Sequence, residues 1–377
     1  MKNTNKFIIA LFLTVGIFSC TEQEKLKNTE FDFELIYTIG LQGDMNAILE
    51  LLDSIPDKNL TDKQISLKDK YYKRFRERNE EYTYKTNDTL IIDVVEIFHD
   101  YWNKVLVDNN AIENENTKLE NKFVDLLYEN NYISSEFPRD SVYENLSDYL
   151  MDLITQKGFY SNAMGKTQGI YDLFLWASTN KQIYDIKLPE KNIKVQVDFM
   201  ENFVSNGWAD YATFGRYYAS GWATQDALYC VKKAYDISSE SFDVSYLKHE
   251  AQHFADYKTF PLLEQTDLEY RAKLTELSTA QETIYKLISV FIKRSEKNKE
   301  LAHPFAQYCI ICDLSKRIFN KEFVSDMNKW EKVPYQKINK VSIELIKQNT
   351  ADLNNIGAET VTKLIQRMNY NCTGKEN

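Results

Sequence analysis

The sequence Tyr246-Leu-Lys-His-Glu-Ala-Gln-His-Phe-Ala-Asp256 contains the pattern H-E-x-x-H, formed by His249, Glu250 and His253. Residues four apart on a helix project from the same face, so both imidazoles could bind one metal ion. Glu250 lies beside the first histidine, where its carboxylate could activate a water molecule. The chain has only 4 histidines, and this segment contains two of them. The motif therefore predicts a catalytic metal site, with a surface helix carrying two solvated histidines as the alternative.

A catalytic zinc site needs three protein ligands and one open position for water, so a third ligand must lie elsewhere. The segments His249-Glu-Ala-Gln-His253 and Leu268-Glu-Tyr-Arg-Ala-Lys-Leu274 resemble the gluzincin class of zinc metallopeptidases. That resemblance implies a third ligand that is a glutamate on the helix after the H-E-x-x-H helix. The metzincin pattern, H-E-x-x-H-x-x-G-x-x-H, is excluded because Asp256 and Thr259 occupy its two later positions.

Two glutamates could be the third ligand that the resemblance implies. Glu269 lies 16 positions after His253, and Glu276 lies a further seven along. Seven residues are nearly two helical turns, so both carboxylates lie on one helical face. Ala272 favours Glu269, because a small residue there lets the two helices approach. Alternatively, Thr266-x-x-Glu269 fits a capping box, in which Glu269 would only cap its own helix.

Other side chains near the motif could support the site. Asp256, three residues after His253, could orient a metal-bound imidazole. Gluzincins often place such an aspartate four residues after the glutamate ligand, but that position is Lys273 here. A further donor should stabilise the oxyanion of the transition state. The candidate donors, which the sequence does not separate, are Tyr257, Tyr270, Arg271 and His303.

The N-terminal segment has the features of an export signal. Lys2 and Lys6 precede an apolar run at 7–18 that is too short to form a stable transmembrane helix. The sequence Ile-Phe-Ser-Cys20 resembles a bacterial lipobox, which implies acylation of Cys20 and removal of everything before it. We therefore expect a lipoprotein signal peptide at 1–20 and an exported protein, anchored by its lipid to a membrane at the periplasmic face or the cell surface. An ordinary secretory signal cut near Ser19 is the alternative.

The composition indicates which partners are disfavoured and how large a core the protein can form. Asp and Glu outnumber Lys and Arg by 56 to 46, and the resulting net charge of −10 argues against nucleic acid as a partner. The 25 Tyr and 21 Phe can fill a large core. Cys309-Ile-Ile-Cys312 lies in an apolar helical run, where we expect buried thiols or one structural bridge.

Hydrophobic periodicity predicts an α+β fold. A polar tether at 21–30 precedes a helical region at 31–157, where apolar residues recur at helical spacing. From Gly158 onward, strand-length segments rich in β-branched and aromatic residues occur at 170–176, 182–188, 193–199 and 227–231. Helices are expected to follow the H-E-x-x-H helix at 277–296, 304–320, 341–348 and 355–369. We therefore expect a zincin-like domain at 158–377, with a small mixed sheet and a C-terminal helical extension.

The predicted reaction is hydrolysis with Zn²⁺ as the cofactor. Zinc lowers the pKa of water toward about 7, Glu250 accepts the proton, and the hydroxide attacks a carbonyl. We therefore expect a gluzincin-like metallopeptidase that acts on a peptide or protein substrate. Two alternatives remain open: a non-catalytic binding or scaffold lipoprotein with a zincin-like fold, and a zinc amidase acting on a non-peptide amide.

Overall fold

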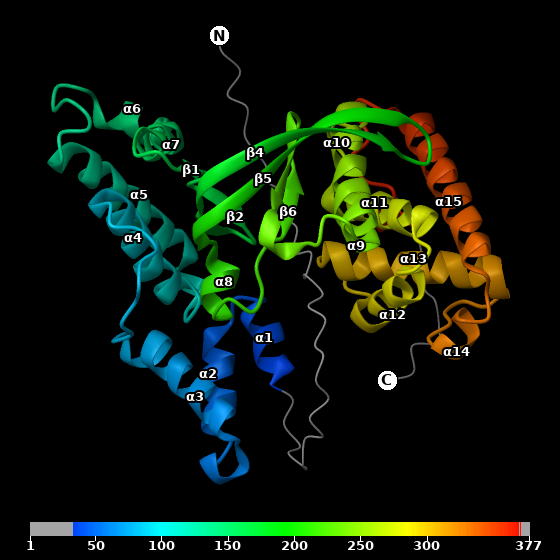
Figure 1. The fold of residues 1–377 in the computed structure, drawn as a ribbon, viewed down its shortest axis with the longest axis horizontal. Coiled ribbons are helices and arrows are strands. Elements are labelled where there is room, and N and C mark those ends of the chain that lie inside the picture. The colour runs from blue at the N-terminus through cyan, green and yellow to red at the C-terminus, as the bar shows by residue number, and fades with distance from the viewer. Residues whose placement is uncertain (1–32, 369, 371–377) are drawn as a thin grey trace. The chain divides into compact units, whose positions relative to one another are not determined.

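The computed structural model describes residues 33–368 and 370, and its fold is α+β, as predicted (Figure 1). The predicted signal peptide at 1–20, the tether at 21–30 and the acylation of Cys20 lie outside the described residues. Within the described part of the chain, no helix is long and apolar enough to cross a membrane.

The described chain divides into two compact units. The first contains residues 33–179 and 200–220, and the second contains residues 180–199 and those from 221 onward. This division differs from the predicted boundary near 158. The reason is a long hairpin of β4 (Phe174–Lys187) and β5 (Asn192–Asn206), whose base belongs to the first unit and whose tip belongs to the second.

The first unit is mainly helical, and three of its α-helices begin at side-chain caps. The Asp88 carboxylate accepts a hydrogen bond from the Ile91 amide at the start of α4. Thr61 and Gln64 form a capping box on α3. The α-helices are α1 (Glu34–Gly40), α2 (Met45–Asp53), α3 (Asp62–Tyr71), α4 (Thr89–Val105), α5 (Ile112–Glu129), α6 (Arg139–Glu144), α7 (Leu146–Gln156) and α8 (Trp208–Ala212).

The predicted strands are present, but the two central ones are longer than their sequence pattern indicates. A five-stranded sheet has the order β1-β4-β5-β7-β6, and β2 pairs with β3 in a separate ribbon. The predicted strands at 170–176 and 182–188 are joined, because β4 continues through residues 177–181, where the sequence Ala-Ser-Thr-Asn-Lys shows no hydrophobic alternation. The other strands are β1 (Tyr160–Ser161), β2 (Gly165–Thr167), β3 (Ile170–Asp172), β6 (Gly221–Ala223) and β7 (Ala227–Val231).

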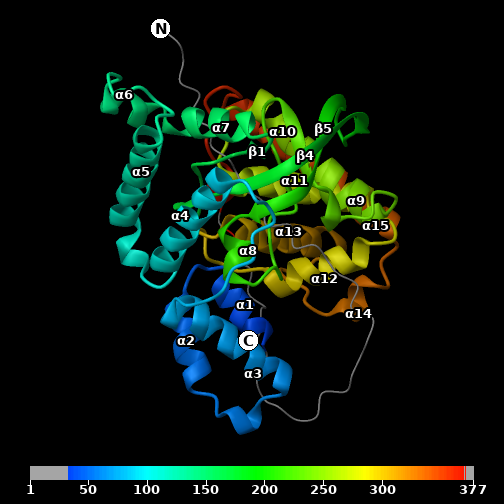
Figure 2. The same ribbon diagram turned by 60° about the vertical axis from the view of Figure 1, so that its left-hand side comes forward.

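The second unit contains the H-E-x-x-H helix, and α10 and α11 lie side by side in both views (Figures 1 and 2). The predicted helix at 355–369 is wrong. Gly357, with φ +124°, ends α15, and among the described residues after it only the short η6 (Ile365–Arg367) is helical. The helices are α9 (Glu240–Phe242), η5 (Asp243–Lys248), α10 (His249–Thr259), α11 (Gln265–Thr279), α12 (Ile284–Arg294), α13 (Ala302–Phe319), α14 (Met327–Trp330) and α15 (Tyr335–Ile356).

Helix α11 lies at the centre of this unit, where it packs against α10, α13 and α15. Every residue from 266 to 278 is buried, although five of them are charged. The apolar members Leu274 and Leu277 join the core of α12, α13 and α15. In that core Cys309 is a free buried thiol and Cys312 is disulfide-bonded, so the two cysteines of the C-x-x-C pair are not joined to each other.

Candidate metal centre

Helix α10 presents the two motif histidines toward α11. It begins at His249, directly after the π-helix η5, and it packs against β6, β7 and α11. Gly221 on β6 permits the close approach of η5, because a Cβ atom at this position would overlap the Tyr246 ring and the Tyr229 carbonyl. The backbone of the sheet thus fixes where the first turn of α10 begins.

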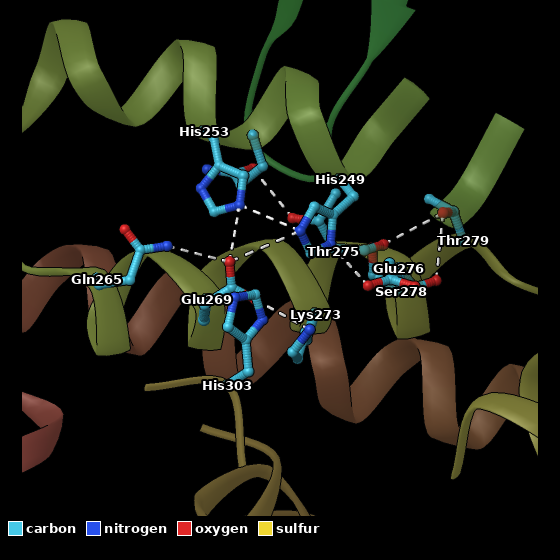
Figure 3. Close-up of polar contacts among 11 residues, drawn as sticks. His249, His253, Gln265, Glu269, Lys273, Thr275, Glu276, Ser278, Thr279 and His303 are labelled. Atoms are coloured by element: carbon cyan, nitrogen blue, oxygen red, sulfur yellow. Dashed lines mark hydrogen bonds and ion pairs between the residues drawn. The ribbon is translucent and has the colours of Figure 1, made fainter. Parts of the chain in front are cut away.

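Three donor atoms converge between α10 and α11 (Figure 3). Nε2 of His249 lies 3.1 Å from Nε2 of His253. Oε1 of Glu269 lies 3.3 Å from Nε2 of His253 and 3.9 Å from Nε2 of His249. Tetrahedral ligands at bond lengths of about 2.0–2.1 Å are separated by about 3.3 Å. Two of the three separations are close to this value and the third is longer, so the buried group could hold a metal ion.

Glu276 lies beside the same histidine but does not belong to the group of three. Its Oε1 is 2.7 Å from Nδ1 of His249, on the opposite side of the ring from the convergent nitrogen. A carboxylate at that position holds the proton on Nδ1 and leaves the lone pair of Nε2 directed at the metal position. The structure thus places Glu269 among the three donors and Glu276 behind one of them.

The alternative capping box of Thr266 and Glu269 requires Thr266 at the N-cap. Helix α11 instead begins at Gln265, and its N-cap is Glu264. Thr266 is therefore inside the helix and Glu269 lies beyond its first turn. Glu269 does not cap the helix, because its carboxylate is directed at the histidines of α10.

Glu250 is fully buried, and neither of its carboxylate oxygens has a hydrogen-bond partner among the described residues. Burial raises the pKa of Glu250 to about 8, with the carboxylates of Glu269 and Glu276 adding to the rise and His249 opposing it. Buried carboxylates are normally hydrogen-bonded, so an unpartnered one next to three convergent donors indicates a missing component. A water molecule beside a metal ion would provide that partner.

The charges of the group depend on one another. Burial opposes the charged form of His249, but the hydrogen bond to Glu276 raises the pKa of its imidazole above the ordinary value. Burial lowers the pKa of His253 to about 4. Although burial acts in the opposite direction, His303 and Lys273 hold the pKa of Glu269 well below its usual range. His253 and Glu269 are therefore deprotonated at neutral pH, as metal ligands must be.

The predicted supporting residues occupy different positions. Asp256 accepts two hydrogen bonds from Arg271, at 2.8 and 3.0 Å, and one from Gln252 at 2.9 Å. The carboxylate that orients a motif imidazole is therefore that of Glu276, and Asp256 instead joins α10 to α11 through Arg271. Arg271 also donates to Asn349 on α15, so its guanidinium is occupied by structural partners.

The remaining donor candidates separate into two kinds. The Tyr270 hydroxyl donates to Asp313 at 2.7 Å, so this hydroxyl belongs to the core of the unit. The ring of Tyr257 stacks on His253, with centroids 6.2 Å apart, and its buried hydroxyl has no hydrogen-bond partner within the described part of the chain. Nδ1 of His303 lies 2.8 Å from Oε2 of Glu269. Tyr257 and His303 therefore lie at the group, whereas Tyr270 and Arg271 support the surrounding helices.

Sequence reasoning missed the position of Lys273. Its Nζ lies 2.9 Å from Oε2 of Glu269, and the residue is only 6% exposed. Its spacing of four residues from Glu269 is the signal that could have found it, because Glu–Lys pairs at this spacing meet on a helix.

The chain was compared with known proteins in three ways. No protein-family model matches it, and neither a curated protein nor a solved structure does so. The functional argument therefore depends on the geometry of the buried His-His-Glu group, which could hold a metal ion.

Proposed function

We propose that this protein is a zinc-dependent hydrolase and, most directly, a metallopeptidase. The observation that carries the proposal is the convergence of His249, His253 and Glu269 next to the unpartnered carboxylate of Glu250. Two imidazole nitrogens and one carboxylate oxygen are a ligand set that suits catalytic zinc, and such sites leave a fourth position open.

The side chains of this chain have distinct parts in the proposed reaction. Zinc held by the three ligands would activate a water molecule and polarise the substrate carbonyl. Glu250 accepts the proton of the attacking water and later delivers it to the leaving amine. Burial raises the pKa of Glu250, which favours a carboxyl group that can hold a proton during the reaction. Tyr257 offers a hydroxyl beside His253 that could donate to the developing oxyanion.

The substrate and location belong to the same proposal. We propose a peptide or protein substrate, met outside the cytoplasm by an enzyme anchored through acylated Cys20. The net charge of −10 supports a partner other than nucleic acid. A non-peptide amide would need the same zinc chemistry, so a zinc amidase is a variant of this proposal.

One observation favours a different function. His249, Glu250 and His253 each have an exposed fraction of 0%. A metal ion held by residues that solvent does not reach could be structural, as it would be in a non-catalytic binding or scaffold lipoprotein. Catalysis instead requires that a substrate carbonyl reach the metal position.

Metal content and cleavage of the purified mature protein test the proposal together. We expect about one equivalent of zinc, lost in His253→Ala, and hydrolysis within a panel of peptides and cell-wall amides by the wild type alone. The class of substrate cleaved separates a peptidase from an amidase. Stoichiometric zinc without any hydrolysis would support the scaffold, and absence of stoichiometric metal would overturn the proposal.

A further inference from the structure

The two oxygens of Glu269 have different surroundings. Oε1 faces the histidine nitrogens of α10, at 3.3 and 3.9 Å. Oε2 faces two nitrogens that come from outside the His-His-Glu group: Nζ of Lys273 at 2.9 Å and Nδ1 of His303 at 2.8 Å (Figure 3). Lys273 comes from the next turn of α11, and His303 comes from the first turn of α13.

A carboxylate can bind a metal ion through one oxygen or through both. In a three-ligand zinc site, a second oxygen from the same carboxylate would occupy the position that water and substrate need. We infer that Lys273 and His303 clamp Oε2 of Glu269, so that this glutamate binds metal through Oε1 alone and the fourth position stays open. The inference rests on the proposed metal centre, but it concerns how the ligand is held, whichever amide is hydrolysed.

The position of Lys273 supports this role. The lysine is buried in a cluster that contains three glutamates, and its pKa is raised because Glu269 and Glu276 outweigh the effect of burial. A buried ammonium is costly unless it is paired, so the side chain is held where it meets Oε2. A lysine has no lone pair to offer the metal while it is charged, and it therefore blocks Oε2 without becoming a ligand itself.

His303 completes the clamp from a second helix. It is the exposed member of the group, with a side chain that is 33% exposed. Its Nδ1 lies 2.8 Å from Oε2 and so occupies the space beside that oxygen. Because Lys273 and His303 lie on different helices, both the rotation and the tilt of the Glu269 carboxylate are constrained.

The test uses the full mature protein loaded with Zn²⁺ or Co²⁺. In Lys273→Met, we expect Glu269 to bind through both oxygens, which raises the number of protein ligands. The visible absorption of bound Co²⁺ should then weaken, because five-coordinate Co²⁺ absorbs less strongly than four-coordinate Co²⁺. Loss of the nearby positive charge should also tighten Zn²⁺ binding by more than about a hundredfold, because an ammonium and a divalent cation a few ångströms apart repel each other strongly even at an effective dielectric constant of about 20.

Three further variants make the result specific. Lys273→Arg retains the charge and should keep the wild-type spectrum. His303→Ala removes the half-exposed partner, is expected to fold, and should shift the spectrum part of the way even if the lysine variant fails to fold. Lys68→Met is the matched control, because Lys68 is also buried and paired, with Asp57 at 2.8 Å, but belongs to the first unit. It should change neither the Co²⁺ spectrum nor the zinc affinity.

The outcomes separate the clamp from the proposed function. If Lys273→Met and His303→Ala bind metal more weakly with an unchanged Co²⁺ spectrum, the two residues are merely structural and the clamp is overturned. The hydrolase proposal would survive that result if the wild type still binds zinc and cleaves its substrate. If the wild type binds no metal, both the clamp and the proposed function fail.

Discussion

Each unit buries a carboxylate completely, but the two carboxylates have opposite surroundings. In the first unit, Asp172 accepts hydrogen bonds from the amides of Trp208 and Leu173, at 2.8 and 3.0 Å, and from the Thr167 hydroxyl at 3.1 Å. In the second unit, Glu250 has no hydrogen-bond partner among the described residues. Burial raises the pKa of both groups, to about 7 for Asp172 and about 8 for Glu250. The same burial therefore produces a satisfied structural group in one unit and an unsatisfied group in the other.

The buried histidines differ in the same way. His99 packs against the rings of Tyr82 and Tyr211, at centroid distances of 4.4 and 4.6 Å. Burial, together with the charge of Arg74, lowers the pKa of His99 to about 3. In contrast, Glu276 raises the pKa of His249. His99 packs among aromatic rings, whereas His249 in the candidate metal centre is hydrogen-bonded to the Glu276 carboxylate.

The largest expected effect is that of Glu250→Gln. If Glu250 is the general base, the variant should lose about 10²- to 10⁴-fold in rate. Its thermal midpoint should change little, because the substitution removes no hydrogen bond and replaces a buried carboxyl group by an amide of similar size. Hydrolysis rate and thermal unfolding of the same preparation measure both effects. Cleavage at the wild-type rate would show that Glu250 is not the base.

Removing the metal should have the next largest effect. A ligand at about a thousand times its dissociation constant stabilises the folded state by about 4 kcal/mol. For a unit of this size, that corresponds to a fall of roughly 10 °C in the thermal midpoint on adding a chelator. His253→Ala should start near the lower midpoint and respond little to chelator. An equal response in the variant would place the bound metal elsewhere.

Both tests concern the H-E-x-x-H motif, which can be predicted well from the sequence. The H-E-x-x-H motif is local, because one helix determines that His249 and His253 share a face. The choice between Glu269 and Glu276 is not local. Both lie on one face of α11, and the register of α11 along α10 decides which carboxylate meets Nε2 and which meets Nδ1 of His249.

Helix α11 also shows why its burial was hard to predict. Its charged residues are typical of a solvent-exposed helix, yet each has a partner inside the protein. Asp267 accepts hydrogen bonds from the amides of Leu364 and Ile365, Arg271 pairs with Asp256, and Lys273 pairs with Glu269. The first two pairs involve the C-terminal segment and another helix, and the third lies within α11 itself, so hydrophobic periodicity reveals none of them.

A smaller effect is expected in the first unit. Asp172→Ala should lower the stability by at least about 2 kcal/mol, because it leaves the buried amides of Trp208 and Leu173 without an acceptor. Asp172→Asn is the matched control, since its amide oxygen can replace Oδ1 and accept from both amides. Thermal unfolding compares the two variants. If the alanine and asparagine variants are equally stable, the carboxylate is not the structural acceptor that its hydrogen bonds indicate.

The Asp172→Asn variant also tests how the stability of the fold depends on pH. The folded-state pKa of Asp172, about 7, lies above the ordinary value of 3.8, so the folded protein retains a proton that the unfolded chain has lost. The contribution of Asp172 to stability should therefore decrease as the pH rises from about 4 to about 7 and stay constant above that. The difference in thermal midpoint between the wild type and Asp172→Asn should follow this course. A difference independent of pH would contradict the raised pKa.

The smallest expected effect concerns His99. Because burial and Arg74 lower its pKa to about 3, its ring should not titrate between pH 5 and 8. NMR of the histidine ring protons measures this titration directly, and the spectrum of His99→Phe assigns the His99 signals. The variant should be close to the wild type in stability, because one aromatic ring replaces another beside Tyr82 and Tyr211. A titration of His99 near its ordinary pKa of 6.5 would remove the contrast between the units. His99 would then be as responsive to charge as the histidines of the candidate metal centre, and the contrast between the units would depend on Glu250, which has no hydrogen-bond partner among the described residues.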